Sequence, residues 1–465
     1  MNAKRPNQQL KLPFTQNGTG EAQSILRQGV EASTSSSGTK SPAADAAKMM
    51  EAICSSRNLS EAIRRVIANK GAPGVDGLTV HQLEAHFKRH GPQTVSQLLS
   101  GTYQPAPVQR VEIPKPDGGM RKLGIPTVTD RVIQQAVLQV LNPLFEPTFS
   151  HFSYGFRPGR SAHQAVRQAQ AYIAEGHAWV VDIDLEKFFD QVNHDKLMGQ
   201  LQKRIVDKRV LHLVRSYLNA GVMEDGLVTR SEEGTPQGGP LSPLLSNIVL
   251  DELDKELEKR GHVFVRYADD CNIYVRSQRA GQRVMESVSD YISRKLKLKV
   301  NQKKSAVDKP GKRKFLGFTF SDRKASVLIS GQAIERFKDR IRELTRRGKS
   351  ALQVIDGLNT YLRGWCGYFG HSDGYWTVRD LDSWIRRRLR SLTWRAWRTP
   401  RKRFRELVRR GVGQSEAIRM IRYRKGCWDA SNTPAMKAAL PVRYWHDYLQ
   451  LLSLLQSWQR MHSQP

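Results

Sequence analysis

The chain has 465 residues, with 75 Lys and Arg against 44 Asp and Glu, which gives a net charge of +31 and a pI near 10.2. This length corresponds to about three domains. No apolar run approaches the ~18 residues that a membrane span needs, no apolar signal core opens the chain, and the four cysteines lie too far apart for a Cys-pair zinc module or a disulfide framework. We therefore expect a soluble protein of a reducing cytoplasm with no membrane partner.

The positive charge and the tryptophans concentrate at the C-terminal end. Residues 331–465 contain 28 Lys and Arg against 11 Asp and Glu, together with eight of the nine tryptophans, whereas the rest of the chain has a net charge of +14. Arginines neutralise phosphates and aromatic rings stack on unpaired bases, so this composition predicts a nucleic-acid-binding segment. The alternative is a soluble domain with solvated charged faces and tryptophans in its core.

The N-terminal third predicts a mixed domain after a disordered extension. Residues 1–45 are rich in Gln, Asn, Ser, Thr and Gly and show no apolar periodicity. Helical spacing begins near residue 46 and stops at the turn 71–74. Two strands are expected at 108–113 and 121–125, followed by a helix over 130–141 that stops around Pro143 and Pro147.

The middle of the chain continues this α+β pattern, and the end is helical. Strands are expected at 179–183, within 263–275 on both sides of an acidic turn, and at 315–320. Helices are expected after Asn193, which is a favourable N-cap, and over 241–257. The predicted domains are a disordered extension (1–45), an α+β region (46–330), an all-α region (331–425) and a basic-aromatic helical tail (426–465).

Two groups of carboxylates follow predicted strands. Asp269 and Asp270 lie at the tip of a hairpin, where adjacent acids repel each other and are expected to bind a divalent cation; an ordinary Asp-rich turn is the alternative. Asp182 and Asp184 lie at the end of strand 179–183. Two-metal phosphoryl transfer needs carboxylates that converge on cations about 3.5–4 Å apart. Spacing alone does not choose between Asp182 and Asp184.

The ordered motifs resemble those of the group II intron-encoded reverse transcriptase/maturase family. Residues 267–270 read YADD, residues 184–190 read DLEKFFD, and the segment 234–248 contains PQG ahead of a helix. Further blocks at 69–77, 113–126, 153–161, 298–305 and 315–318 follow the family's order, and 358–369 resembles its maturase domain. The resemblance implies a right-hand polymerase fold, with fingers and a ferredoxin-like antiparallel palm sheet, followed by an all-α maturase/thumb domain.

The resemblance also implies an RNA-directed DNA polymerase that uses two Mg²⁺ ions. It selects Asp184, Asp269 and Asp270 as metal ligands, places the Leu185 carbonyl near one ion, and makes Lys304 the proton donor to pyrophosphate; Asp182 is left with a structural role. The implied nucleotide-binding residues are Lys115, Arg121, Phe189, Gln237 and Tyr267. The implied primer grip is Leu316 and Gly317. For Phe189, a steric gate against ribonucleotides competes with simple core packing.

The expected partners are group II intron RNA, a primer–template RNA/DNA duplex, target DNA and dNTPs. The RNA-binding residues expected in the basic segment are Arg363, Trp365, Arg386, Arg387, Arg388, Arg390, Arg401, Lys402 and Arg403. The chain lacks the Cys pairs of an HNH endonuclease domain, which implies a subclass that borrows its primer. Alternatives are a splicing-only RNA-binding maturase, a host-adapted reverse transcriptase in defence or repair, and a polymerase of another class.

Overall fold

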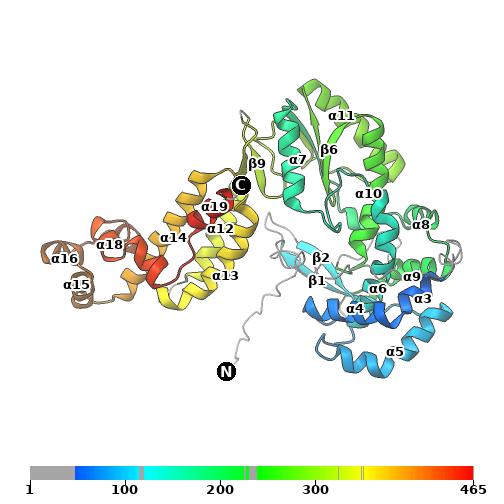
Figure 1. The fold of residues 1–465 in the computed structure, drawn as a ribbon, viewed down its shortest axis with the longest axis horizontal. Coiled ribbons are helices and arrows are strands. Elements are labelled where there is room, and N and C mark those ends of the chain that lie inside the picture. Colours follow the sequence, from blue (N-terminus) through cyan, green and yellow to red (C-terminus); the bar gives the residue numbers. More distant parts are fainter. Residues whose placement is uncertain are drawn as a thin grey trace, which may run out of the picture. The chain divides into compact units, whose positions relative to one another are not determined.

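The computed structural model describes residues 48–114, 120–224, 227–229, 238–322, 324–346, 348 and 350–463. Among these residues the contacts define two compact units, unit 1 ending at Arg313 and unit 2 beginning at Lys314 (Figure 1). The predicted extension 1–45 and the residues Lys115 and Gln237 lie outside the described residues, as does the side chain of Arg121. No helix in the described ranges is long and apolar enough to cross a membrane.

Unit 1 is built on a four-stranded antiparallel sheet with the order β6-β7-β3-β8. Its strands are β3 (Trp179–Ile183), β6 (Val263–Tyr267), β7 (Asp270–Val275) and β8 (Ala306–Asp308). Helices α7 (Ala162–Ala174), α10 (Ser242–Lys259) and α11 (Gln278–Tyr291) pack against this sheet (Figure 1). The predicted strand 179–183 and the predicted pair of strands within 263–275 are confirmed. The central strands are buried at consecutive positions, as in 264–266 of β6 and 271–275 of β7, so both faces of these strands are covered.

A second sheet in unit 1 has the order β2-β1-β4-β5. Its strands are β1 (Val108–Pro114), β2 (Met120–Ile125), β4 (Val222–Glu224) and β5 (Leu227–Thr229). The other helices of unit 1 are α3 (Met49–Cys54), α4 (Ser56–Ala68), α5 (Leu83–Ser100), α6 (Val128–Phe145), η2 (Glu146–Thr148), η3 (Phe188–Asp190), α8 (His194–Gln202), α9 (Lys208–Asn219) and η4 (Ile292–Leu296). Asn193 caps α8 as predicted, because its side chain accepts a hydrogen bond from the Lys196 amide.

Helix α6 runs through Pro143 and ends at Phe145, which agrees with the predicted stop around Pro143 and Pro147. Proline removes one helical hydrogen bond, but the helix carries Leu141 and Phe145 into the core, where they are 0% and 3% exposed. Burial of such side chains is worth about 1.5–3 kcal/mol each, which offsets the lost bond.

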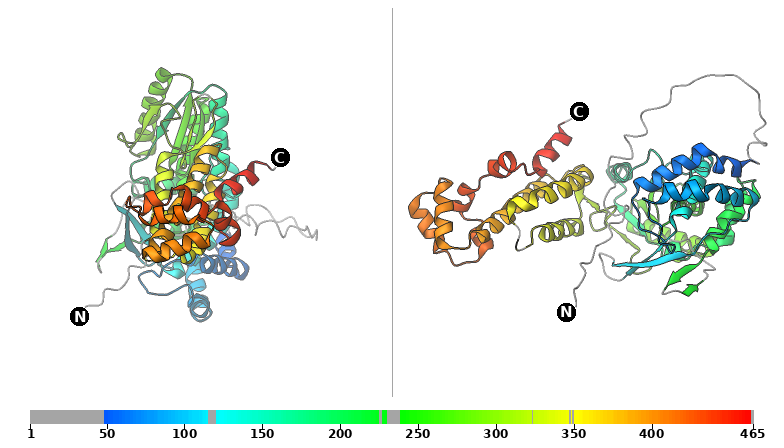
Figure 2. Two further views of the ribbon diagram at one scale, coloured as in Figure 1. Left: turned by 90° about the vertical axis from the view of Figure 1, so that its left-hand side faces the viewer. Right: turned by 90° about the horizontal axis from the view of Figure 1, so that it is seen from below.

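Unit 2 contains a β-hairpin followed by helices. The hairpin strands are β9 (Phe318–Phe320) and β10 (Val327–Ile329). The helices are α12 (Gly331–Leu344), α13 (Ala351–Phe369), α14 (Tyr375–Ala396), α15 (Pro400–Arg409), α16 (Gln414–Ile421), α17 (Cys427–Ala430), α18 (Pro434–Ala439), η5 (Tyr444–Tyr448) and α19 (Leu454–His462). The long helices α12, α13 and α14 lie alongside one another, and the short helices α15 to α18 gather at one end of the unit (Figures 1 and 2).

Local contacts explain why unit 2 begins at residue 314 and not at the expected boundary after 330. The Tyr368 hydroxyl in α13 donates to the Leu316 carbonyl at 2.9 Å, and the Asp373 amide donates to the Val327 carbonyl at 2.7 Å. The segment 426–465 also joins this unit, since Trp445 is fully buried in the same core.

Candidate active site

The β6–β7 hairpin carries two of the predicted ligands in a tight turn. Tyr267 pairs with Asp270, which leaves Ala268 and Asp269 as the two turn residues. Ala268 has a φ of +58°, a backbone conformation that residues with a Cβ rarely adopt. The turn puts Asp269 at the tip and Asp270 at the first position of β7, and both side chains are partly exposed.

The strand register brings the third predicted ligand to the same edge of the sheet. In the β3–β7 ladder, Asp182 pairs with Asn272 and Ile183 pairs with Cys271. Asp184 directly follows the last paired residue of β3, and Asp270 directly precedes Cys271 in β7, so both lie at the same end of these two strands. Two carboxylates that lie 86 positions apart in the chain are therefore neighbours across two strand ends.

Asp182 has a different environment from Asp184. Its carboxylate Oδ2 accepts hydrogen bonds from Arg313 Nε at 2.8 Å and Nη2 at 2.5 Å. The same guanidinium donates to the Lys304 carbonyl at 2.5 Å. Asp182 thus ties β3 to the segment that follows β8, an arrangement consistent with the structural role expected for it.

The backbone of Asp184 is held by the segment 299–305. The Asn301 amide donates to the Asp184 carbonyl at 2.8 Å, and the Asp184 amide donates to Ser305 Oγ at 3.0 Å. Leu185, which is 6% exposed, forms a bridge with Val300. Lys304 lies on this supporting segment and is exposed. The structure therefore brings Lys304, Leu185 and the acidic edge into one neighbourhood.

Two aromatic residues of the predicted nucleotide site are partly buried. Phe189 lies in η3, packs against the core of unit 1, and meets Phe188 edge-on with ring centroids 5.2 Å apart. The Tyr267 ring lies 6.2 Å from that of Phe156. Burial raises the pKa of the Tyr267 hydroxyl above its usual value of 10, so it stays neutral at the pH of polymerisation.

No group of three or more His, Cys, Asp or Glu side chains in the described part of the chain is placed to hold a metal ion. The donor chemistry at the acidic edge nevertheless suits Mg²⁺, which prefers carboxylate oxygens. The three predicted ligands are carboxylate residues: Asp269 and Asp270 lie at the β6–β7 turn, and Asp184 follows the end of β3.

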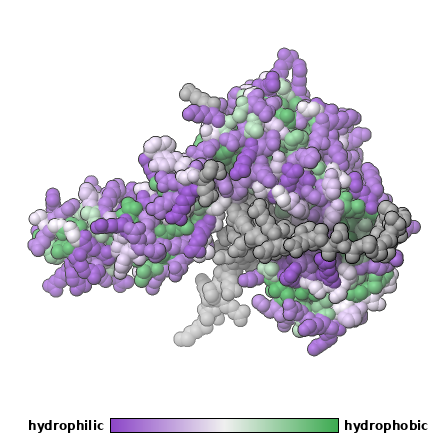
Figure 3. All heavy atoms as spheres, in the orientation of Figure 1, coloured by the Kyte–Doolittle hydropathy of each residue, from purple (hydrophilic) through white to green (hydrophobic). Residues whose placement is uncertain are grey.

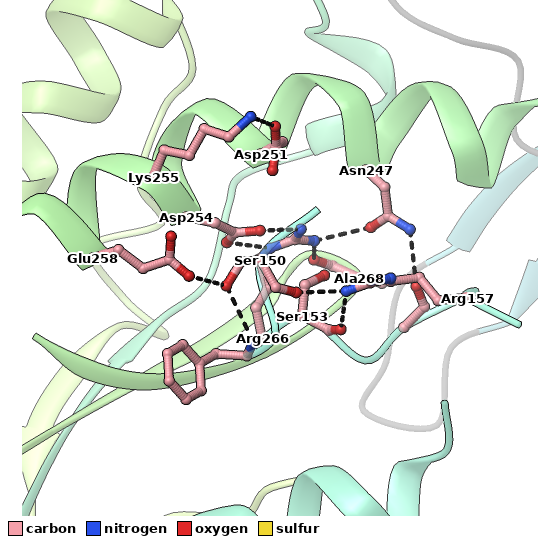
Figure 4. Close-up of polar contacts among 12 residues, drawn as sticks. Ser150, Ser153, Arg157, Asn247, Asp251, Asp254, Lys255, Glu258, Arg266 and Ala268 are labelled. Atoms are coloured by element: carbon pink, nitrogen blue, oxygen red, sulfur yellow. Dashed lines mark hydrogen bonds and ion pairs between the residues drawn. The ribbon is translucent and has the colours of Figure 1, made fainter. Parts of the chain in front are cut away.

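Four residues around the hairpin were not nominated from the sequence: Gly155, Asn247, Asp254 and Arg266. A Cβ on Gly155 would lie 2.3 Å from the Ala268 amide nitrogen. Arg266 and Asp254 form an ion pair in which both side chains are fully buried (Figure 4). The signals in the sequence were the positions of Gly155 in the block 153–161 and of Asn247 in the segment 234–248, together with that of Arg266 directly before YADD.

The primer-grip residues predicted in unit 2 lie in a tight turn that precedes β9. Leu316 and Gly317 have φ values of +52° and +84°, and Gly317 lies against the Phe369 ring. The Leu316 carbonyl is held by the Tyr368 hydroxyl.

The predicted RNA-binding residues of unit 2 divide into exposed and buried sets. Arg363, Arg401 and Lys402 are exposed, and the face of unit 2 seen in Figure 3 is mostly hydrophilic. Trp365 and Arg390 correct the expectation, because they are only 7% and 6% exposed and belong to the interior. Arg390 Nε donates to the Ser431 carbonyl at 2.8 Å, and burial lowers its pKa to about 10.

The remaining four arginines are partly exposed and bound within the unit. Arg386 pairs with Asp382, and Arg388 donates to Thr345. The guanidinium of Arg387 lies 4.1 Å from the centroid of the Trp428 ring, and that of Arg403 lies 4.5 Å from the centroid of Trp394. These contacts orient the arginines along the helices.

Comparisons with known proteins extend these observations. A family model described as reverse transcriptase (RNA-dependent DNA polymerase) matches residues 113–320, and a model for the maturase-specific domain of group II introns matches residues 334–411. Protein YkfC of Escherichia coli is 36% identical over 289 residues, covering 54% of this chain and 76% of YkfC. The group II intron-encoded protein LtrA of Lactococcus lactis is 28% identical over 413 residues, covering 68% of this chain and 69% of LtrA.

Two solved structures are also similar in part. A chain of a partial Cas6-RT-Cas1–Cas2 complex is 27% identical, covers 53% of this chain and 42% of its own length, and has a TM-score of 0.36. Apo telomerase from Candida tropicalis is 12% identical, covers 80% of this chain and 74% of its own length, and has a TM-score of 0.42. The fold assignment rests on the strand topology and the family models, not on these superpositions.

An antiparallel sheet with YADD in a hairpin turn, within a matched polymerase segment, defines a reverse transcriptase palm. The helical unit that follows matches the maturase-specific domain. The chain belongs to the group II intron-encoded reverse transcriptase/maturase family. It is therefore an RNA-directed DNA polymerase with a maturase domain, and the predicted fold class is confirmed.

Proposed function

We propose that this chain copies intron RNA into cDNA at the edge formed by Asp184, Asp269 and Asp270, and that unit 2 binds the same intron RNA during splicing and retrohoming. The observation that supports the catalytic part is the β3–β7 register, which brings Asp184, just after β3, to the strand end where Asp270 begins β7 beside the turn that holds Asp269. Two Mg²⁺ ions bound there, with the Leu185 carbonyl near one of them, would activate the primer 3′-hydroxyl and stabilise the leaving pyrophosphate.

The chain's own side chains perform the positioning. Phe189, partly buried against Phe188, offers a ring edge that excludes a 2′-hydroxyl. Tyr267 contributes a neutral hydroxyl beside the turn. Lys304 donates a proton to pyrophosphate from the segment that supports Asp184. Lys115 and Arg121 contact the triphosphate and Gln237 lines the sugar–base pocket, as their motifs imply.

Unit 2 supplies the RNA-binding surface and, through Leu316 and Gly317, the primer grip. Its net charge of +17 over residues 331–465 favours a polyanionic partner. Exposed Arg363, Arg401 and Lys402 contact phosphates, whereas arginines paired with tryptophans present ordered guanidinium groups. The relative LtrA is a group II intron-encoded protein, which supports intron RNA as the partner; the primer–template duplex, target DNA and dNTPs complete the proposed set.

The decisive experiment is primer extension on an RNA template with Asp184→Asn, Asp269→Asn and Asp270→Asn. Each variant is expected to lose more than about 100-fold in rate, the scale on which a transition-state charge contact acts. Asp195→Asn is the matched control, since Asp195 is 83% exposed and pairs with Arg215 at the surface. Full activity in the three site variants would refute the catalytic assignment.

An intron-splicing assay on the same variants separates the two functions. Splicing that survives while cDNA synthesis is lost supports separate surfaces for polymerisation and RNA binding. A parent protein that supports splicing without any primer extension would instead establish the splicing-only function.

A further inference from the structure

The hairpin turn that carries Asp269 accepts a hydrogen bond from one fully buried arginine. Arg266, on β6, is 0% exposed. Its Nη1 donates to the Ala268 carbonyl at 2.8 Å and to Asn247 Oδ1 at 3.0 Å, while Nε and Nη2 donate to the two carboxylate oxygens of Asp254 at 2.7 and 2.5 Å (Figure 4). Four of the five N–H groups of the guanidinium are thereby used.

The side-chain partners of Arg266 lie on α10 and in the turn, and α10 is itself bonded to the loop around Gly155. Asp254 and Asn247 lie seven residues apart on α10, and therefore on one face of that helix. Asn247 Nδ2 donates to the Gly155 carbonyl at 2.9 Å. Gly155 in turn lies against the amide of Ala268. The turn is thus held on one side by α10 and on the other by the loop around Gly155.

The loop around Gly155 is held by backbone hydrogen bonds to β6 and by the side chain of a second arginine, Arg157. The Arg266 amide donates to the Phe152 carbonyl, and the Tyr154 amide donates to the Arg266 carbonyl, both at 2.9 Å. Arg157 Nη1 donates to the carbonyls of Ser150 and Ser153 (Figure 4). Hydrogen bonds therefore connect β6 and the loop 150–157 around Arg266.

The bond to Ala268 acts on the peptide that carries Asp269. A carbonyl that points at a fixed donor cannot rotate, and its peptide plane includes the nitrogen of the next residue. Ala268 holds a left-handed backbone conformation that persists only where the surroundings determine it. Arg266 supplies such a determinant directly beneath the turn.

We propose that Arg266 is a positioning residue for polymerisation, which fixes the Ala268–Asp269 peptide and through it the placement of Asp269 and Asp270. This inference rests on the proposed catalytic role of those two carboxylates. Asp254 orients the guanidinium, and Asn247 couples it to the loop at Gly155. Arg266 does not touch substrate and acts only through the turn.

A different result is expected if Arg266 has a purely structural role. If Arg266 serves only to neutralise Asp254, replacing both residues with apolar side chains of similar volume restores a stable protein with normal activity, because buried ion pairs can often be exchanged for hydrophobic residues without loss of stability. Removing Arg266 alone does not discriminate, because it leaves the Asp254 carboxylate buried without its partner.

The test uses the full chain carrying Arg266→Met together with Asp254→Leu, and separately Arg266→Lys. Lysine keeps the positive charge, but it lacks the planar guanidinium group that donates to Asp254 and to the Ala268 carbonyl at the same time. We expect the double variant to unfold within a few degrees of the parent Tm and to lose on the order of 100-fold in kcat for single-nucleotide addition, the scale of a roughly 1 Å misplacement. The KM for primer–template should stay unchanged.

A binding measurement supplements the rates. With a dideoxy-terminated primer, which blocks chemistry, the affinity for the incoming dNTP should fall in the double variant and in Arg266→Lys. Arg260→Met is the control, because Arg260 pairs with Glu256 on the same helix at the protein surface; its kcat and dNTP affinity should match the parent.

Parental kcat and dNTP affinity in the double variant would overturn the proposal. If the double variant fails to fold, Arg266→Lys decides: a stable, fully active lysine variant overturns the proposal, and a stable variant with reduced kcat supports it. Failure of the proposed function is distinguishable, since Asp269→Asn would then retain activity whatever Arg266 does.

Discussion

Gly155 and the turn residue Ala268 lie so close together that no side chain fits between them. A Cβ on Gly155 would approach the Ala268 nitrogen to 2.3 Å and the Tyr267 carbonyl carbon to 2.9 Å. Both obstacles are backbone atoms, which cannot move aside as a flexible side chain does. The YADD hairpin therefore packs directly against the loop 153–157, and this close contact requires a residue without a side chain at position 155.

The first prediction follows from this contact. Gly155→Ala should push the turn away and reduce the rate of primer extension by about 100-fold, while RNA binding by unit 2 is retained in a filter-binding assay. Gly199→Ala is the matched control, because a Cβ added to Gly199 in α8 would meet no neighbouring element of the described structure within 4 Å and should slightly stabilise the helix. Unchanged extension by Gly155→Ala would show that the hairpin tolerates displacement.

The second prediction concerns Phe189. A steric gate predicts that Phe189→Val increases ribonucleotide incorporation relative to deoxynucleotide incorporation, measured as the ratio of kcat/KM values for matched nucleotides. Because Phe189 also packs against Phe188 and the core, the variant should lose about 1 kcal/mol or more of stability. Equal discrimination in variant and parent would leave only the packing role.

The third prediction concerns pH and the pair of acids around Arg209. Arg209 donates to both oxygens of Glu51 at 2.9 Å, and these hydrogen bonds hold the pKa of Glu51 below its usual value of 4.5. Burial of Asp207 raises the pKa of its carboxyl group. Hydrogen bonds from Arg209 and the Met50 amide outweigh burial and lower the pKa of Asp207 below its usual value of 3.8.

Because both folded-state pKa values are lowered, the folded state binds fewer protons than the unfolded state, and the stabilisation is present near neutral pH and lost as the pH falls. The difference in Tm between the parent and Arg209→Met should be largest at pH 6–7 and shrink from about pH 5 to pH 3. Arg294→Met is the control, since its pair with Asp290 is exposed and should contribute little at any pH. A difference that stays constant with pH would contradict the assignment.

The fourth prediction separates folding from RNA binding on one helix. Trp365 and Arg363 lie two residues apart on α13, with Trp365 in the core and Arg363 exposed. Trp365→Ala should cost about 3–5 kcal/mol of the stability of unit 2, measured by denaturant unfolding. Arg363→Ala should leave stability unchanged, weaken intron RNA binding and reduce the salt slope by about 1. Loss of RNA affinity without loss of stability in Trp365→Ala would reverse these roles.

The sequence by itself determined the elements and motifs that depend on short-range patterns. Short apolar runs located β3 and the β6–β7 hairpin, Asn193 marked the start of α8, and the YADD turn was recognisable because its residues are contiguous. The charge of the C-terminal region likewise indicated a polyanion as partner. Each of these features is encoded within a few residues or in composition alone.

Only the tertiary structure decided which polar residues act together. Arg313, 131 positions from Asp182, binds that carboxylate, while the strand register brings Asp184 and Asp270 to the same end of β3 and β7. Burial separated Trp365 from Arg363, and it revealed the pair of Arg266 and Asp254 under the hairpin. Such contacts depend on which distant segments of the chain pack together and on how much water this packing excludes. The spacing of residues along the sequence predicts neither of these.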